Sequence, residues 1–162
     1  MTPHDVIRNT IEMGHQLLTT YLSDLDDAEL MVRVTPGANH PAWQLGHLVT
    51  SEHEIITAVG CPMPGLPAGF AEAYTPETST SDDPAGFHKK AEYLAAIEEQ
   101  RTGTLAALDT LSADDLDKPA PEQMREYAPT VGVAFNVIGL HTLMHATQWV
   151  PLRRKLGKPV LI

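Results

Sequence analysis

Apolar side chains recur with the period of an α-helix in four long stretches of the chain, and we find no stretch that alternates apolar and polar residues convincingly, as a β-strand does. The first stretch opens with Thr2, Pro3 and Asp5, residue types that favour the start of a helix. The apolar stripe that follows predicts a helix over residues 3–22. A short helical turn and a Pro-Gly turn are expected within residues 23–38.

Proline and glycine mark ends of the second and fourth stretches, and the third is rich in alanine, leucine, glutamate and lysine. Pro41 stands in the first turn of the second stretch and Gly60 provides its stop, while Gly157 and Pro159 end the fourth. The connections between the stretches are rich in proline and are expected to be largely irregular. The sequence therefore predicts helices over residues 41–60, 84–111 and 130–156, joined by connections over residues 61–83 and 112–129.

Four amphipathic helices, with one long connection between the second and the third, predict an all-α fold, namely a four-helix bundle with a long crossover. We find no internal repeat and no linker that would divide the chain. A single domain over residues 1–162 is therefore expected. The two long connections are expected at the ends of the bundle, where they could cover a site.

The charge of the chain restricts its partners. Lysine and arginine number 11 against 21 aspartates and glutamates, which gives a net charge of −10. This balance argues against binding to nucleic acid, whose phosphates require a basic surface, and against binding to an anionic membrane.

Cysteine content and the N-terminal sequence bear on the compartment. Cys61 is the single cysteine, which excludes a disulfide framework and a metal site built from cysteines, and fits a reducing compartment. The first residues lack the basic start and the apolar run of a signal peptide, and no apolar run approaches the ~20 residues of a membrane span. A cytoplasmic protein is expected.

The segment GLHTLMHATQW, residues 139–149, carries two histidines four positions apart within a stretch typical of a buried helix. His141 and His145 should lie on one helix face, and His47 on the second helix supplies a third imidazole from a neighbouring element. Three nitrogen ligands would leave positions open for water or substrate. Two half-buried, hydrogen-bonded histidines explain the pair equally simply, and Thr142 stands where a zinc-protease motif has its glutamate. Periodicity alone leaves both interpretations open.

Two segments carry a family resemblance. NHPAWQLGHLVTSEHE and GLHTLMHATQWVPLRRKLGKP closely resemble the DinB-like superfamily of damage-inducible, metal-dependent bundle proteins. Order, spacing and helix layout agree across the whole chain. The chain departs from the family pattern at Thr147 and at Pro151. The matching residues are Trp43, Leu45, Gly46, His47, His141, His145, Gln148, Leu152, Arg153, Arg154, Gly157 and Pro159.

The resemblance implies a divalent metal ion held by His47, His141 and His145. Zinc or nickel is the first expectation, and iron or copper would also suit three imidazoles. Gln148 lies one turn beyond His145, and Glu54 lies seven residues beyond His47 on the same face. Both are candidate hydrogen-bond partners of the ligands or of bound water.

The resemblance also implies an activity, since characterised relatives include thiol S-transferases and a mycothiol-dependent maleylpyruvate isomerase. We therefore expect a metal-dependent enzyme, most simply a thiol-dependent S-transferase or a related detoxification or isomerisation enzyme, with a small-molecule substrate and a low-molecular-weight thiol. The alternatives are a metal-dependent hydrolase and a non-catalytic, stress-associated metal-binding protein. A fourth protein ligand, such as His15 or Glu54, would favour the last. A homodimer is expected from the family and from the prevalence of symmetric dimers.

Pro151 is unusual because it falls inside the fourth predicted helix. Proline removes a backbone donor there and clashes with the carbonyl four residues earlier, so we expect a bend. The hydroxyl of Thr147 is expected to bond back to the carbonyl of Leu143.

The remaining candidates have simpler interpretations. His15 is expected at the edge of the core with a hydrogen bond, and His53 at the surface. Cys61 has no neighbouring base and is not expected to act as a nucleophile. Trp43 and Trp149 are expected to pack in the core. Arg153 and Arg154 are expected to complement the helix dipole rather than to bind an anionic substrate.

Overall fold

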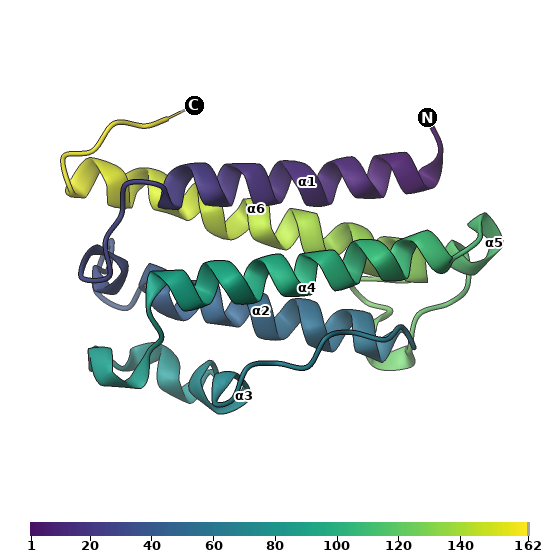
Figure 1. Ribbon diagram of the computed structural model, residues 1–162, viewed down its shortest axis with the longest axis horizontal. Coiled ribbons are helices and arrows are strands. Elements are labelled where there is room, and N and C mark those ends of the chain that lie inside the picture. The colour runs from purple at the N-terminus through teal and green to yellow at the C-terminus, as the bar shows by residue number, and fades with distance from the viewer. Residues whose placement is uncertain (162) are drawn as a thin grey trace.

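Four long helices dominate the structure, a computed structural model that describes residues 1–161 (Figure 1). No β-strand occurs within these residues, where the one extended pairing is an isolated bridge between Pro119 and Thr130. The all-helical prediction is therefore confirmed for the described part of the chain. The long helices are α1 (Pro3–Leu22), α2 (Pro41–Ala58), α4 (Lys90–Thr110) and α6 (Val131–Lys155).

Short helical segments occupy parts of the connections. They are the α-helical turns α3 (Phe70–Ala73) and α5 (Ala113–Leu116) and the 3-10 turns η1 (Glu29–Met31), η2 (Glu77–Thr80), η3 (Pro84–Gly86) and η4 (Glu122–Met124).

The third long helix begins later than predicted, at Lys90 rather than at residue 84. Residues 84–86 form the separate turn η3, and Phe87 and Lys89 have extended backbones. The backbone N–H of Lys89 donates to the Glu92 carboxylate at 2.7 Å, which caps the helix at this point. The predicted start was wrong because residues 84–86, which include Pro84 and Gly86, form their own turn, and the capping residues Lys89 and Glu92 set the start of the helix.

Other helix ends follow their local signals. Thr2 caps α1 by accepting from the Asp5 backbone N–H at 3.2 Å, and the Asp5 carboxylate accepts from the Thr2 N–H at 2.7 Å. Gly60 and Gly157 follow α2 and α6 with φ values of 87° and 70°. This left-handed conformation favours glycine, which explains why these helices end where the sequence predicted.

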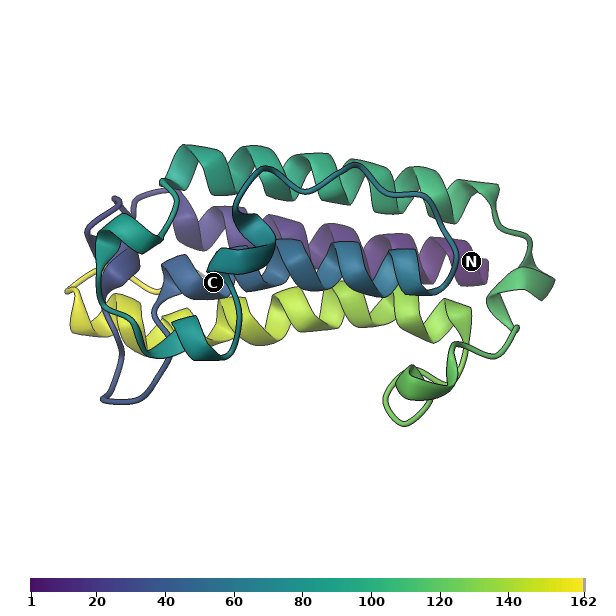
Figure 2. The same cartoon turned by 90° about the horizontal axis from the view of Figure 1, so that it is seen from below.

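The long helices lie side by side, and two run in each direction (Figures 1 and 2). α1 and α6 run in one direction and α2 and α4 in the other, so the connection between α2 and α4 has to travel back along the molecule. α6 packs against both α1 and α2, and α4 packs against α2 and α1. The facing middles of α2 and α6 carry the histidines singled out above.

A pair of glycines sets how closely α1 and α6 approach. A Cβ atom at Gly14 would lie 2.8 Å from the Gly139 carbonyl oxygen, and a Cβ at Gly139 would lie 2.5 Å from the backbone of Thr10. The backbones of α1 and α6 are therefore in direct contact at these glycines, and a side chain at either position would push the two helices apart. This contact fixes the position of the α6 segment that bears His141 and His145.

The helix α6 continues through Pro151 to Lys155. The hydroxyl of Thr147 donates to the carbonyl of Met144 at 2.9 Å, three residues back, so the predicted bond to Leu143 was wrong. The bend itself stays a prediction. None of the helices described is long and apolar enough to cross a lipid bilayer.

Candidate metal centre

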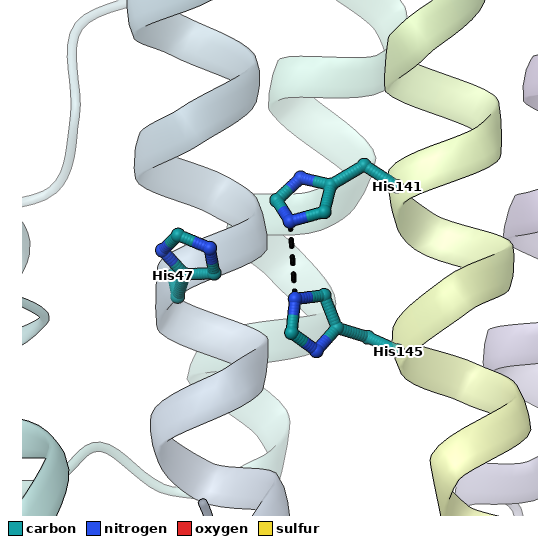
Figure 3. A group of neighbouring side chains, drawn as sticks. All are labelled: His47, His141 and His145. Carbon is teal, nitrogen blue, oxygen red and sulfur yellow. Dashed lines mark hydrogen bonds between the residues drawn. The ribbon is translucent and has the colours of Figure 1, made fainter.

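Three imidazoles converge between α2 and α6 (Figure 3). His47 projects from α2, and His141 and His145 project from successive turns of α6. One ring nitrogen from each lies within 4.8 Å of the others. Within residues 1–161, no fourth histidine, cysteine, aspartate or glutamate belongs to this group.

The spacing within the α6 pair fits a shared metal ion. The Nε2 atoms of His141 and His145 are 3.0 Å apart. This is a hydrogen-bond distance if one nitrogen carries a proton. It is also about the separation of two nitrogens that lie ~2.1 Å from one ion at roughly a right angle. The donor set therefore suits zinc and other divalent transition metals.

The ring of His47 is held from two sides. Trp43 stacks on it, with ring centroids 4.8 Å apart and planes inclined by 13°. The hydroxyl of Ser51 lies 3.3 Å from its Nδ1 atom. Nε2 is left as the nitrogen directed toward His141 and His145, as Figure 3 shows.

Trp43 connects the cluster to the segment between α2 and α4. Its indole N–H donates to the carbonyl of Thr75 and to the hydroxyl of Thr78, each at 3.1 Å. The sequence predicted only core packing for Trp43. The structure confirms its burial and adds a second role, because a ring fixed by two hydrogen bonds limits the movement of the imidazole stacked on it.

Burial keeps the three imidazoles neutral. It lowers the pKa of His141 to about 4, with a smaller contribution from His47. Burial, then His141 and His47, lower the pKa of His145 to about 3. Burial also lowers the pKa of His47. Neutral imidazole is the form that binds a metal, so the cluster is prepared to bind one at neutral pH.

Two glutamines extend the cluster toward the C-terminal half of α6. The Gln44 amide nitrogen donates to the Gln148 side-chain oxygen at 2.8 Å, and the Gln44 oxygen accepts from the indole N–H of Trp149. Gln148 is close enough to His145 to oppose the lowering of its pKa. The sequence predicted Gln148 as a partner but missed Gln44, although its position one turn before His47 was a usable signal.

Glu54, the other candidate partner, is exposed. Ser51, one turn beyond His47, lies against that imidazole instead. Seven residues of an α-helix make nearly two full turns, so Glu54 shares the face of His47. It lies about 10 Å further along the helix axis, however, which is too far for its carboxylate to contact the His47 ring.

His15 lies at a separate small cavity, with both apolar and polar lining, rather than in the histidine cluster. This cavity, of about 20 Å³, has room for one water molecule and is lined by His15, Glu52 and Arg101 from three different helices. His15 Nε2 is 3.6 Å from the Glu98 carboxylate, and the hydroxyl of Thr104 donates to Glu52 at 2.6 Å. The sequence missed Glu52, whose spacing of four from the buried Leu48 places it on an inward face.

Replacing Glu52 with glutamine should change the pH dependence of stability. Burial raises the Glu52 pKa to about 7, while Thr104 and Arg101 act in the opposite direction. The folded chain therefore holds this proton more tightly than the unfolded chain does. The stability gained from this tighter proton binding is fully present below about pH 4.5 and is lost as the pH rises through about 7.

The free energy of unfolding of Glu52→Gln, relative to that of the parent protein, should therefore increase as the pH rises from about 5 to about 8. Urea unfolding at both pH values measures this difference. Glu54→Gln makes the same change at an exposed position and should show no such trend. An equal effect of Glu52→Gln at the two pH values would contradict the assignment.

Arg153 is a structural residue rather than a surface cation at the helix end. Its side chain is fully buried and donates to both carboxylate oxygens of Asp24, at 2.6 and 2.8 Å. It also donates to the carbonyls of Tyr21 and Pro159. Arg153 lies in the last turn of α6, as the dipole interpretation requires, and the structure adds an ion pair with Asp24 that ties the end of α6 to the end of α1. Arg154 is exposed.

Two further predictions can be compared with the structure. His53 was expected at the surface but is half-buried, with Nδ1 3.2 Å from the side-chain oxygen of the buried Gln100. Cys61 is buried, and burial raises the pKa of its thiol, which agrees with the prediction that it is not a nucleophile.

Comparison with known proteins identifies the family to which the chain belongs. No curated protein matches the chain. A crystal structure described as the conserved protein of a locus from Enterococcus faecalis is similar, with a TM-score of 0.67 and 15% sequence identity over 98% of this chain and 99% of that one. This likeness shows a shared fold. The family model of the DinB superfamily matches residues 10–149, which include all three clustered histidines. The chain therefore belongs to the DinB superfamily.

Proposed function

We propose that His47, His141 and His145 bind one divalent metal ion through their Nε2 atoms and that the protein is a metal-dependent enzyme. The observation that carries the proposal is the convergence of three neutral imidazoles from two facing helices, two of them with Nε2 atoms 3.0 Å apart. Zinc or nickel is the first expectation, and iron or copper also suits this donor set.

The neighbouring side chains have the positions needed to orient such ligands. Ser51 lies at Nδ1 of His47, and Trp43 restrains the plane of that ring. Nδ1 of His145 is buried and has no hydrogen-bond partner among residues 1–161. The side-chain oxygen of Gln148 is the acceptor we assign to it, because a ligating histidine usually donates its second N–H to an oxygen.

Thiol transfer is the reaction we favour. A divalent cation would supply a Lewis acid that lowers the pKa of a coordinated thiol or water. The family resemblance favours a low-molecular-weight thiol as one substrate and a small electrophile as the other. The buried histidines act as ligands in this proposal and not as bases, because their lowered pKa values make them poor proton acceptors near neutral pH.

Two alternatives remain distinct from this proposal. A metal-dependent hydrolase would use the same three histidines. A non-catalytic protein would use the ion only for stability and would be expected to close the coordination shell with a fourth side chain. The two candidates for that ligand, His15 and Glu54, lie outside the cluster, which favours catalysis.

Metal analysis of untagged protein, followed by a thiol-consumption screen, tests the proposal. We expect about one divalent ion per chain and metal-dependent loss of thiol in the presence of some electrophiles. Failure to bind any of zinc, nickel, iron and copper would overturn the metal site. Ester hydrolysis without thiol consumption would favour the hydrolase, and full metal occupancy without either activity would favour the non-catalytic protein.

We also assign the packing of the long helices to a four-helix bundle with a long crossover between α2 and α4, which is supported by their directions in Figure 1. The homodimer stays a prediction. Exposed apolar side chains on α1 and α6, namely Met13, Leu140 and Met144, offer a surface for it.

A further inference from the structure

A pocket of about 230 Å³ lies beside the histidine cluster, between the turn at residues 34–39 and the C-terminal part of α6. Gln44 and Gln148 both line it. Gln44 lies one turn before His47, and Gln148 lies one turn after His145, so the hydrogen-bonded glutamines border both the pocket and the cluster. The volume is smaller than that of typical small-molecule sites, which start at ~300 Å³, so the pocket suits a small ligand.

The chemistry of this pocket favours an uncharged ligand. Within residues 1–161, none of the residues that line it carries a charge. Two cations near its edge are already engaged. Arg33 pairs with Asp82 at 2.6 Å, and Lys155 donates to the carbonyls of Arg33 and Val34. A carboxylate in the pocket would give up part of its hydration and meet no charged lining residue in return, which is unfavourable.

The hydrogen bonds fix which end of each glutamine faces which partner. The indole N–H of Trp149 can only donate, so the atom of Gln44 that it contacts has to be the oxygen. Gln44 then presents its nitrogen to Gln148, which accepts with its own oxygen. Of the two glutamines, Gln148 is consequently the one whose amide nitrogen is left as a donor at the pocket wall, where Thr35 and Asn39 also lie. The indole N–H of Trp149 thus determines, through the two side-chain amides, that Gln148 presents a hydrogen-bond donor to the pocket.

We propose that this pocket binds the second, electrophilic substrate as an uncharged molecule whose oxygen, a carbonyl or a similar acceptor, receives a hydrogen bond from the Gln148 side-chain nitrogen. The role as a substrate site rests on the proposed function, whereas binding in the pocket does not require the metal. The apolar side chains of Ala38, Pro151 and Leu152 contact the rest of the molecule. Gln148 would serve both halves of the site, with its oxygen toward His145 and its nitrogen toward the substrate.

Three matched probes test this proposal. Acetophenone, ethylbenzene and benzoate have similar sizes and offer a neutral acceptor, no acceptor and a charged acceptor. We expect acetophenone to bind roughly five- to tenfold more tightly than ethylbenzene, because one hydrogen bond separates them, and benzoate to bind more weakly than acetophenone. NMR titration of the protein with and without Zn²⁺ measures the three affinities, and the indole signal of Trp149 reports the location.

Variants assign the effect to the pocket. Gln148→Leu should remove the preference for acetophenone while ethylbenzene still binds, and Gln16→Leu, at an exposed glutamine on α1, should change neither. Ala38→Phe fills the pocket and should weaken all three probes. Equal binding of acetophenone and ethylbenzene, preference for benzoate, or no binding of any probe would overturn the proposal. A protein that prefers acetophenone but binds no metal would overturn the proposed function and leave the pocket assignment standing.

Discussion

His145→Ala is expected to remove most bound metal while leaving the helical content nearly unchanged. His145 is buried and its Nε2 lies 3.0 Å from that of His141, so its loss takes away one of three ligands. We expect the metal affinity to fall by more than about 100-fold, the upper end of what losing an outer hydrogen-bond partner costs. Alanine is a strong helix former, so α6 itself should persist. Mass spectrometry of metals and circular dichroism measure the two quantities.

His4→Ala is the matched control, because it deletes an imidazole on α1 that contacts the carbonyl of Leu111 and lies outside the cluster. It should leave the metal content unchanged. If His145→Ala retained a full complement of tightly bound metal, the assignment of this histidine as a ligand would be wrong.

Gly139→Ala should destabilise the fold, although alanine is favoured over glycine within a helix by about 1 kcal/mol. The new methyl group would lie 2.5 Å from the Thr10 carbonyl atoms and 2.7 Å from the Ile11 backbone nitrogen, positions that belong to backbone and cannot rotate away. α1 and α6 would have to separate. We expect the free energy of unfolding to fall by about 1–3 kcal/mol, the usual cost of overpacking, as measured by chemical denaturation.

The same replacement at Gly65 provides the comparison. A Cβ atom there meets nothing within 4 Å, and the residue lies in the connection after α2. Gly65→Ala should therefore change the free energy of unfolding by less than about 0.5 kcal/mol. A Gly139→Ala protein as stable as the parent would show that the two helices are not held at this distance by the glycine contact. Because Gly139 is two residues before His141, weaker metal binding should accompany the loss of stability.

The amino-acid sequence by itself determined the features that depend on neighbours along the chain. The N-cap at Thr2 and the stops at Gly60 and Gly157 arise within one turn of helix, so their residue types are sufficient to place them. The i, i+4 spacing of His141 and His145 places them on one helix face in any α-helix. Position on a neighbouring predicted helix made His47 a candidate third imidazole, and resemblance to the family then selected it.

The tertiary structure decided the features that depend on contacts between distant segments. The role of Arg153 required Asp24, which is 129 residues away, and that of Gln44 required Trp149 on another helix. Glu54 and Glu52 differ by two positions, yet one is exposed and the other lines a cavity among three helices. Helical periodicity gives the face of a residue but neither its depth nor the partner packed against it. Those are set by how closely the helices approach, which depends here on the backbone contact between Gly14 and Gly139.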